Sequence, residues 1–148
     1  MRIESPKADA GAGGEVSEFT VREAAALLGV SDDTIRRWAD AGRLDLLTGE
    51  NGRALVAGEQ LADLAQQLAA ESALADAFPN SRASARNRLT GIVTRVIKDG
   101  VMAQVEVQAG PFRVVSLMSR EAADELGLAP GTLATASVKA TNVVVELP

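Results

Sequence analysis

The spacing of apolar residues changes once along this chain, near residue 80, and this change limits the folds that the chain can adopt. Before it, apolar residues recur every three or four positions, which is the spacing of amphipathic helices. After it, apolar and polar residues alternate, most clearly over residues 101–107, as in strands with one buried face. Residues 78–83, which contain proline and asparagine, interrupt both patterns. The sequence therefore predicts an α+β protein of two domains, residues 18–77 and residues 84–148, joined by a linker.

Composition and charge exclude several classes of protein. The 148 residues include no cysteine and no histidine, so disulfides, thiol nucleophiles and histidine catalysis are excluded. No apolar run approaches the roughly 18 residues of a membrane helix, and no signal-peptide core is recognisable, so we expect a cytoplasmic protein without membrane contact. Residues 1–17 are rich in glycine, alanine and charge and are expected to form a disordered tail. The net charge of −5 divides into −7 over residues 1–80 and +2 over residues 81–148.

Two short helices with a tight turn between them are predicted at the start of the first domain. Thr20 and Glu23 have the spacing of a capping box for the first helix. Gly29 is placed to end that helix, and Ser31 is placed to cap the next one. Further along, Asn51-Gly52 between short apolar runs predicts a hairpin, and a third helical pattern follows it.

This arrangement resembles the MerR and excisionase class of winged DNA-binding domains. The segments that carry the resemblance are Phe19–Ala25, Gly29–Ser31, Thr34–Trp38 and Gly42–Leu44. It implies a three-helix winged helix-turn-helix, in which the second helix enters the major groove and the hairpin is the wing. By this resemblance bases would be contacted by Thr34 and Arg37, and phosphates by Arg36, Arg43 and Arg53.

A local interpretation of the two arginines on the second helix competes with DNA contact. Arg36 and Arg37 each follow an aspartate, Asp32 and Asp33, by four positions, which is the spacing of exposed ion pairs. The charge of −7 over residues 1–80 also predicts weak non-specific DNA binding, so that specific binding would need two or more DNA-binding domains acting together.

The second domain is predicted to be a five-stranded OB-like β-barrel with one short helix. Strands are expected at residues 93–97, 101–107, 112–118, 133–139 and 142–147, with a helix capped by Ser119 over residues 119–126. Just before the first strand, Ser84, Arg86 and Asn87 offer hydroxyl, guanidinium and amide donors without a carboxylate among them. Lys139 and Thr141 repeat such chemistry near the end of the chain. Together the two stretches suit a tetrahedral oxyanion. Alone, each is better explained as solvated polar residues on a strand.

Three ordered motifs in this domain resemble the Mop domain, the molybdate-binding domain of the molbindins and of molybdate-responsive regulators. They are residues 84–93, residues 125–131 and residues 138–141. The resemblance implies that a molybdate or tungstate dianion is held between subunits. Its ligand groups would come from Ser84, Ala85, Arg86, Lys139, Ala140 and Thr141. Ser119 matches a hydroxyl position of the family, whereas a second hydroxyl position is occupied here by Ala122.

These patterns predict a molybdate-responsive, DNA-binding transcriptional regulator that assembles as a homo-oligomer, a dimer or a hexamer, through its Mop domains. The alternatives are a molybdate or tungstate storage protein whose helical domain serves assembly, and a structural nucleoid-type DNA binder with a vestigial anion site. An enzyme is not expected. Asp124 and Glu125 are adjacent on a helix and so diverge, and the glycines of residues 11–14 lack the lysine of a phosphate-binding loop.

Overall fold

The computed structural model of the protein describes residues 17–78 and 84–148. The expected tail, residues 1–17, and the expected linker, residues 78–83, lie outside the described residues except for Ser17 and Phe78. The chain divides into two compact units, one ending at Ala77 and the other beginning at Phe78, which are called here the helical unit and the strand unit. No helix among the described residues has both the length and the apolar character needed to cross a membrane.

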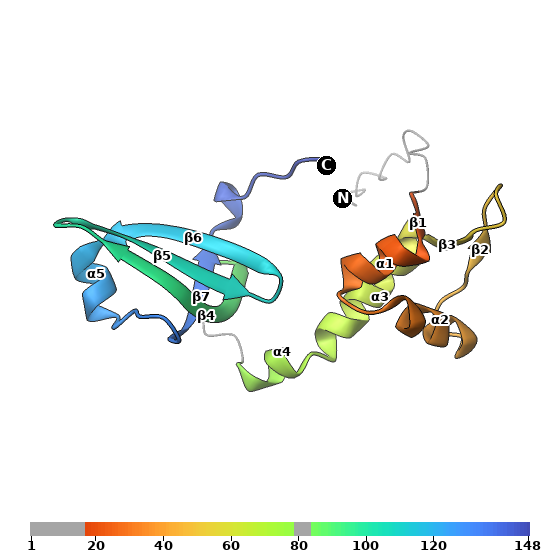
Figure 1. Ribbon diagram of the computed structural model, residues 1–148, viewed down its shortest axis with the longest axis horizontal. Coiled ribbons are helices and arrows are strands. Elements are labelled where there is room, and N and C mark those ends of the chain that lie inside the picture. The colour runs from red at the N-terminus through yellow and green to blue at the C-terminus, as the bar shows by residue number, and fades with distance from the viewer. Residues whose placement is uncertain (1–16, 79–83) are drawn as a thin grey trace, which may run out of the picture. The chain divides into compact units, whose positions relative to one another are not determined.

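The helical unit combines four helices with a small antiparallel sheet (Figure 1). Its elements are β1 (Glu18–Thr20), α1 (Val21–Leu28), α2 (Asp32–Asp40), β2 (Leu47–Thr48), β3 (Ala54–Ala57), α3 (Gly58–Ala70) and α4 (Ala73–Ala77). The strands are ordered β1-β3-β2, so β1 pairs with the hairpin that β2 and β3 form. The predicted hairpin is present, and Gly52 takes a left-handed conformation at its tip with φ 71°.

Local capping chemistry explains where α1 and α2 begin. Thr20 Oγ1 accepts a hydrogen bond from Glu23 N at 3.2 Å, and the Glu23 carboxylate accepts one from Thr20 N at 2.8 Å. These two bonds are the predicted capping box. The hydrogen bonds that the Glu23 carboxylate accepts from Thr20 N and Thr20 Oγ1 lower the pKa of Glu23 below its usual value. Gly29, with φ 68°, ends α1, and Ser31 Oγ then accepts from Thr34 N at 3.2 Å at the start of α2.

The core of the helical unit lies between α1, α2, α3 and β3. Ala24, Ile35 and Val56 are completely buried, and Trp38 packs against them while remaining partly exposed. Burial of a side chain such as Ile35 or Val56 stabilises the fold by about 1.5–3 kcal/mol. Because α1, α2 and β3 all contact this core, the residues on their outer surfaces are held in a fixed arrangement.

The strand unit is a curled four-stranded antiparallel sheet with a short helix at one end (Figure 1). Its elements are β4 (Asn87–Lys98), β5 (Met102–Ala109), β6 (Phe112–Ser119), α5 (Arg120–Glu125), β7 (Leu133–Val138) and the 3-10 turn η1 (Ala140–Asn142). The order is β6-β5-β4-β7. The long strand β4 pairs with β7 from Asn87 to Ile92 and with β5 from Ile92 to Lys98, so it joins the two halves of the sheet.

The prediction of a fifth strand at residues 142–147, and with it of a closed five-stranded barrel, is wrong for the isolated chain. Residues 140–142 form η1, and residues 143–148 have no regular structure. Alternating polarity specifies which side chains face a core, but a strand also needs a neighbouring backbone to bond with. This segment pairs with neither edge strand, β6 or β7, and Val144, Val145 and Leu147 are 80%, 87% and 95% exposed. The sheet is therefore open between those two strands.

The two faces of the curled sheet differ in chemistry. The inner face carries the buried core of Val93, Val105 and Val107. On the outer face Glu106 is buried although it alternates with the core valines, because Arg113 binds it through two nitrogens at 2.6 and 2.9 Å. This ion pair holds the pKa of Glu106 below its usual value.

Candidate functional site

The pairing of β4 with β7 brings the two donor stretches of the strand unit to the same end of the sheet. Asn87, the first residue of β4, lies opposite Val138, the last residue of β7. The Asn87 side chain reinforces this contact, since Nδ2 donates to the Val138 carbonyl oxygen at 3.1 Å. The residues just before β4 and just after β7 therefore emerge side by side. These are the predicted ligand residues Ser84, Ala85, Arg86, Lys139, Ala140 and Thr141.

This end of the sheet is positively charged and open to solvent. Arg86 and Lys139 are exposed, and Arg88 lies opposite Ser137 on the same strand pair. Over the described parts of the chain, no carboxylate lies within ion-pair distance of any of these three cations. Three positive charges, the hydroxyls of Ser84 and Thr141, and nearby peptide N–H groups are what an oxyanion binds. We call this cluster the oxyanion end.

The third predicted element of the site, Ser119, lies at the opposite end of the sheet. Ser119 is opposite Met102 in the β5–β6 pair, near the end of β4 marked by Lys98. At about 3.3 Å per residue, the 12 residues of β4 separate the two ends by up to ~40 Å along the strand. The structure therefore brings six of the seven predicted ligand residues together within one chain, and it does not bring Ser119 to them.

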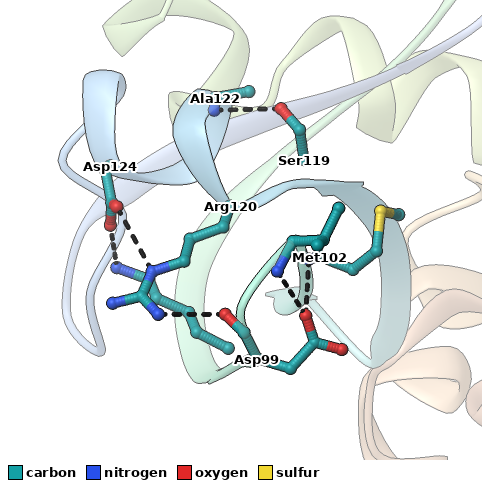
Figure 2. A network of polar contacts seen from close by, with 8 residues as sticks. Asp99, Met102, Ser119, Arg120, Ala122 and Asp124 are labelled. Carbon is teal, nitrogen blue, oxygen red and sulfur yellow. Dashed lines mark hydrogen bonds and ion pairs between the residues drawn. The ribbon is translucent and has the colours of Figure 1, made fainter.

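Ser119 is held in place by the start of α5. Its Oγ accepts a hydrogen bond from Ala122 N at 3.1 Å, which confirms the predicted cap (Figure 2). Beside it, Arg120 donates to the carbonyl oxygen of Asp99 at 3.0 Å and pairs with Asp124 at 3.6 Å (Figure 2). Because Oγ uses a lone pair in the cap, its own O–H remains available to donate outward.

Three of the predicted DNA-contacting residues, Thr34, Arg36 and Arg37, lie on α2. Arg37 Nη2 donates to Thr34 Oγ1 at 3.3 Å, and Thr34 Oγ1 lies 3.0 Å from Ser31 Oγ. Neither Arg36 nor Arg37 forms the ion pair with an aspartate that the local interpretation required, as far as the described residues show. The Arg37 side chain is thus oriented by a neutral hydroxyl and keeps its charge uncompensated.

Arg43 has a different environment from the other predicted contacts. Its guanidinium pairs with Glu71 at 3.1 Å and lies 5.4 Å from the centre of the Trp38 ring. To touch a phosphate it would have to leave Glu71 or share its donors. Arg53, by contrast, lines an open hollow of about 520 Å³ together with Arg36.

One residue that matters to these surfaces, Arg22, is not predicted from the sequence, and another, Asn87, has a different role from the one predicted. Arg22, on the first turn of α1, lines the same hollow as Arg36 and Arg53. The position of Arg22, two residues after the N-cap Thr20, could have marked it as a candidate DNA contact, because a first-turn residue lies at the exposed start of a helix. Asn87 was counted as a donor for the anion, whereas its amide is engaged with Val138 and ties β4 to β7.

Comparison with known proteins divides the chain at the same place. The family model described as a TOBE domain matches residues 83–145, and one described as a helix-turn-helix domain matches residues 18–69. Molybdenum-pterin-binding protein 3 of Clostridium pasteurianum is 41% identical over 63 residues, which cover 42% of this chain and 93% of that protein. Molybdenum-pterin-binding protein MopA of Rhodobacter capsulatus is 40% identical over 68 residues, which are 45% of this chain but only 26% of MopA.

Among solved structures, a molybdate-binding protein from Sporomusa ovata is similar to this chain. It is 31% identical, the match covers 45% of this chain and 100% of that protein, and the TM-score is 0.44.

Proposed function

Because this chain belongs to the family of TOBE-domain proteins that includes the molybdenum-pterin-binding proteins, and carries a helix-turn-helix domain ahead of the TOBE domain, we propose that it is a molybdate-responsive DNA-binding regulator. The TOBE domain would bind the anion, and the helical unit would bind DNA. The observation that carries the proposal is the β4–β7 pairing, which places Arg86 and Lys139 at one end of the sheet.

The chemistry of the oxyanion end suits a tetrahedral dianion. Removing a dianion from water costs several kcal/mol unless charges and donors replace the lost hydration. Arg86 supplies a planar fork that matches two oxygens of the anion, and Lys139 adds a second charge. Ser84 and Thr141 supply hydroxyl donors, and peptide N–H groups of residues 85 and 140 complete the proposed set.

One chain leaves the oxyanion end exposed, so we propose that a second copy covers it. Arg86, Lys139 and Thr141 are all exposed to solvent, where a bound anion would stay largely hydrated and weakly held. Ser119 cannot reach them within its own chain because it lies at the far end of the sheet. A neighbouring copy that presents its own Ser119 would enclose the anion and supply the missing donor. Anion binding would then favour one arrangement of subunits.

The helical unit is proposed to bind DNA through the exposed surface of α2 and the β2–β3 hairpin. Thr34 and Arg37 would contact bases, and Arg36, Arg43 and Arg53 would contact phosphates, with the hairpin acting as a wing. The lack of carboxylate partners for Arg36, Arg37 and Arg53 in the described structure supports this role. Anion-dependent assembly would fix the spacing between the helical units of two copies, and molybdate binding would thereby change the affinity for DNA.

A storage or buffering protein is the second candidate, and the charge of the chain favours it. Residues 1–80 carry a net charge of −7, which opposes binding to a polyanion, and Arg43 is already paired with Glu71. In such a protein the helical unit would serve assembly only. The two candidates separate in one experiment, because a storage protein binds several anions per assembly and does not retain a specific DNA sequence.

Ligand selectivity is the first expected result. Molybdate and tungstate should bind much more tightly than sulfate, although all three are tetrahedral dianions. Sulfate is smaller, so in a site sized for molybdate some donors around it stay unpaired, each costing about 1–3 kcal/mol. Calorimetry with the three anions, run beside native mass spectrometry, measures affinity and stoichiometry together. Equal heats for sulfate and molybdate would leave a generic anion site and remove the molybdate assignment.

Arg37 is expected to determine DNA sequence preference. Arg37→Ala should weaken binding to a duplex selected by the parent protein from a random pool by about 1–3 kcal/mol, if the side chain contacts a guanine. Binding to a scrambled duplex should change little. Arg37→Lys is the matched control, because it keeps the charge and loses the two-pronged donor geometry, so it should lose sequence preference while retaining non-specific affinity. If both variants bind the selected duplex like the parent, Arg37 does not contact a base.

A further inference from the structure

Three arginines from separate parts of the helical unit converge on one hollow. Arg22 comes from the first turn of α1, Arg36 from the middle of α2, and Arg53 from the β2–β3 hairpin. All three line the open hollow of about 520 Å³, together with Asp32 and Gly52. We call it the arginine hollow.

The charges around the arginine hollow are unbalanced. Within the described residues, none of its three arginines has a carboxylate at ion-pair distance, whereas Arg43, Arg113 and Arg120 elsewhere in the chain each have one. The single carboxylate that lines the hollow, Asp32, leaves an excess of positive charge there. In a chain with a net charge of −5 and many acidic residues, three unpaired guanidinium groups around one space indicate a site for an anion.

The hollow is built on rigid elements. Arg22 lies within the capping box, between Thr20 and Glu23. Arg36 is next to Ile35, which is completely buried in the core. Thr20 lies opposite Leu55 in the β1–β3 pair, so the strand that leads into α1 and the hairpin that carries Arg53 belong to one sheet. The backbone positions of the three side chains are therefore tied to one another through the core and the sheet.

The helix α2 separates this hollow from the proposed base-reading residues. Asp32 and Arg36 are four positions apart and both line the hollow. Thr34 and Arg37 are three positions apart and are hydrogen-bonded to each other, so they form a neighbouring pair on the same helix. An anion in the hollow would thus bind on one flank of the exposed surface of α2, with Thr34 and Arg37 on the other flank.

We propose that Arg22, Arg36 and Arg53 together bind a single phosphate of the DNA backbone in the arginine hollow. The inference rests on the proposed DNA-binding function and extends it by assigning Arg22 and by making the three residues one shared site. Guanidinium groups bind phosphate oxygens through paired donors, and three of them from α1, α2 and the hairpin fix the orientation of the helical unit on DNA. Asp32 opposes the phosphate and keeps the affinity low.

The test measures DNA binding by the full chain with fluorescence anisotropy, over a range of salt concentrations. Arg22→Ala should weaken the selected and the scrambled duplex by the same factor, up to about eightfold near 0.1 M salt, since one phosphate contributes a slope of about 0.9 in log K against log salt. The triple variant R22A/R36A/R53A should lower that slope by about 0.9, the value for one shared phosphate, and not by about 2.7, the value for three separate ones. Asp32→Asn should change affinity in the opposite direction and tighten both duplexes.

Three controls make the result decisive. Arg22→Lys keeps the charge and should retain most of the affinity, and thermal unfolding shows whether each variant folds. Inorganic phosphate in place of chloride at equal ionic strength should compete with the duplex more strongly in the parent than in the triple variant, because the same guanidinium groups bind phosphate oxygens; equal competition in both would overturn the proposal. Unchanged binding by both Arg22 variants, or a slope change near 2.7, would also overturn it. A parent protein that binds no DNA would instead contradict the proposed function as a whole.

Discussion

Lys139→Ala is expected to give a protein that folds and binds DNA but no longer responds to molybdate. Lys139 follows β7 at the oxyanion end and has no carboxylate partner among the described residues. Removing one charge beside an enclosed dianion should cost about 2–5 kcal/mol of binding, which is roughly 30-fold to several thousand-fold in affinity. The side chain is exposed in the isolated chain, so its loss should leave the fold intact.

Sedimentation and DNA binding, each with and without molybdate, measure this response in the parent and the variant. The parent should change both its assembly and its DNA affinity, whereas Lys139→Ala should keep the anion-free values throughout. Lys139→Arg is the matched control, because it preserves the charge at the same position and should preserve the response. If saturating molybdate leaves the DNA affinity of the parent unchanged, the two units are uncoupled and the regulator proposal fails.

Gly91→Ala should strongly destabilise the strand unit. Gly91 lies on β4 where this strand passes close to the end of β5, and a Cβ built there would lie 2.2 Å from the Gln108 carbonyl oxygen and 2.9 Å from Ala109 Cα. Both neighbours are backbone atoms, so the strands themselves would have to separate. Overpacking of this kind costs about 1–3 kcal/mol and occasionally more. A unit of about 70 residues has a total stability of about 4–10 kcal/mol, so much of it would be lost.

Urea unfolding monitored by circular dichroism measures the effect, and calorimetry should show that Gly91→Ala binds molybdate more weakly than the parent. Gly100→Ala in the same unit is the control, since a Cβ built at Gly100 has no atom within 4 Å and its backbone is not left-handed. That variant should unfold at the midpoint of the parent. A loss below about 1 kcal/mol for Gly91→Ala would mean that β4 and β5 can separate easily, against the geometry described here.

Features set by neighbours in sequence were predictable from the sequence. The capping box of Thr20 and Glu23, the left-handed Gly29 and the cap at Ser119 each involve residues that are close along the chain, and all are confirmed. The hairpin at Asn51-Gly52 belongs to the same class. Such motifs can be predicted from the sequence because their hydrogen bonds join residues at fixed short spacings along the chain.

Features that need a distant partner were predicted less well. Alternating polarity at residues 142–147 suggested a strand, but the chain offers this segment no paired edge. Arg43 is predicted from the sequence to contact a phosphate, but the pairing with Glu71, 28 residues later, could not be predicted. Arg22 and Arg53 lie 31 positions apart and share a hollow that no local pattern reveals. The prediction that Ser84 and Lys139 share an anion site rests on a family resemblance and not on a local rule, and the β4–β7 register places the two stretches at one end of the sheet.

The distance between Ser119 and Lys139 along the sheet has a consequence for how such a regulator would be tuned. A site that uses both residues has to be shared by two copies, so its ligand affinity is linked by mass action to subunit association. Dilute protein would need more molybdate for half-saturation than concentrated protein. The molybdate threshold of the system would then depend on how much of the protein the cell makes, and a regulator that controlled its own synthesis would move that threshold as it acted.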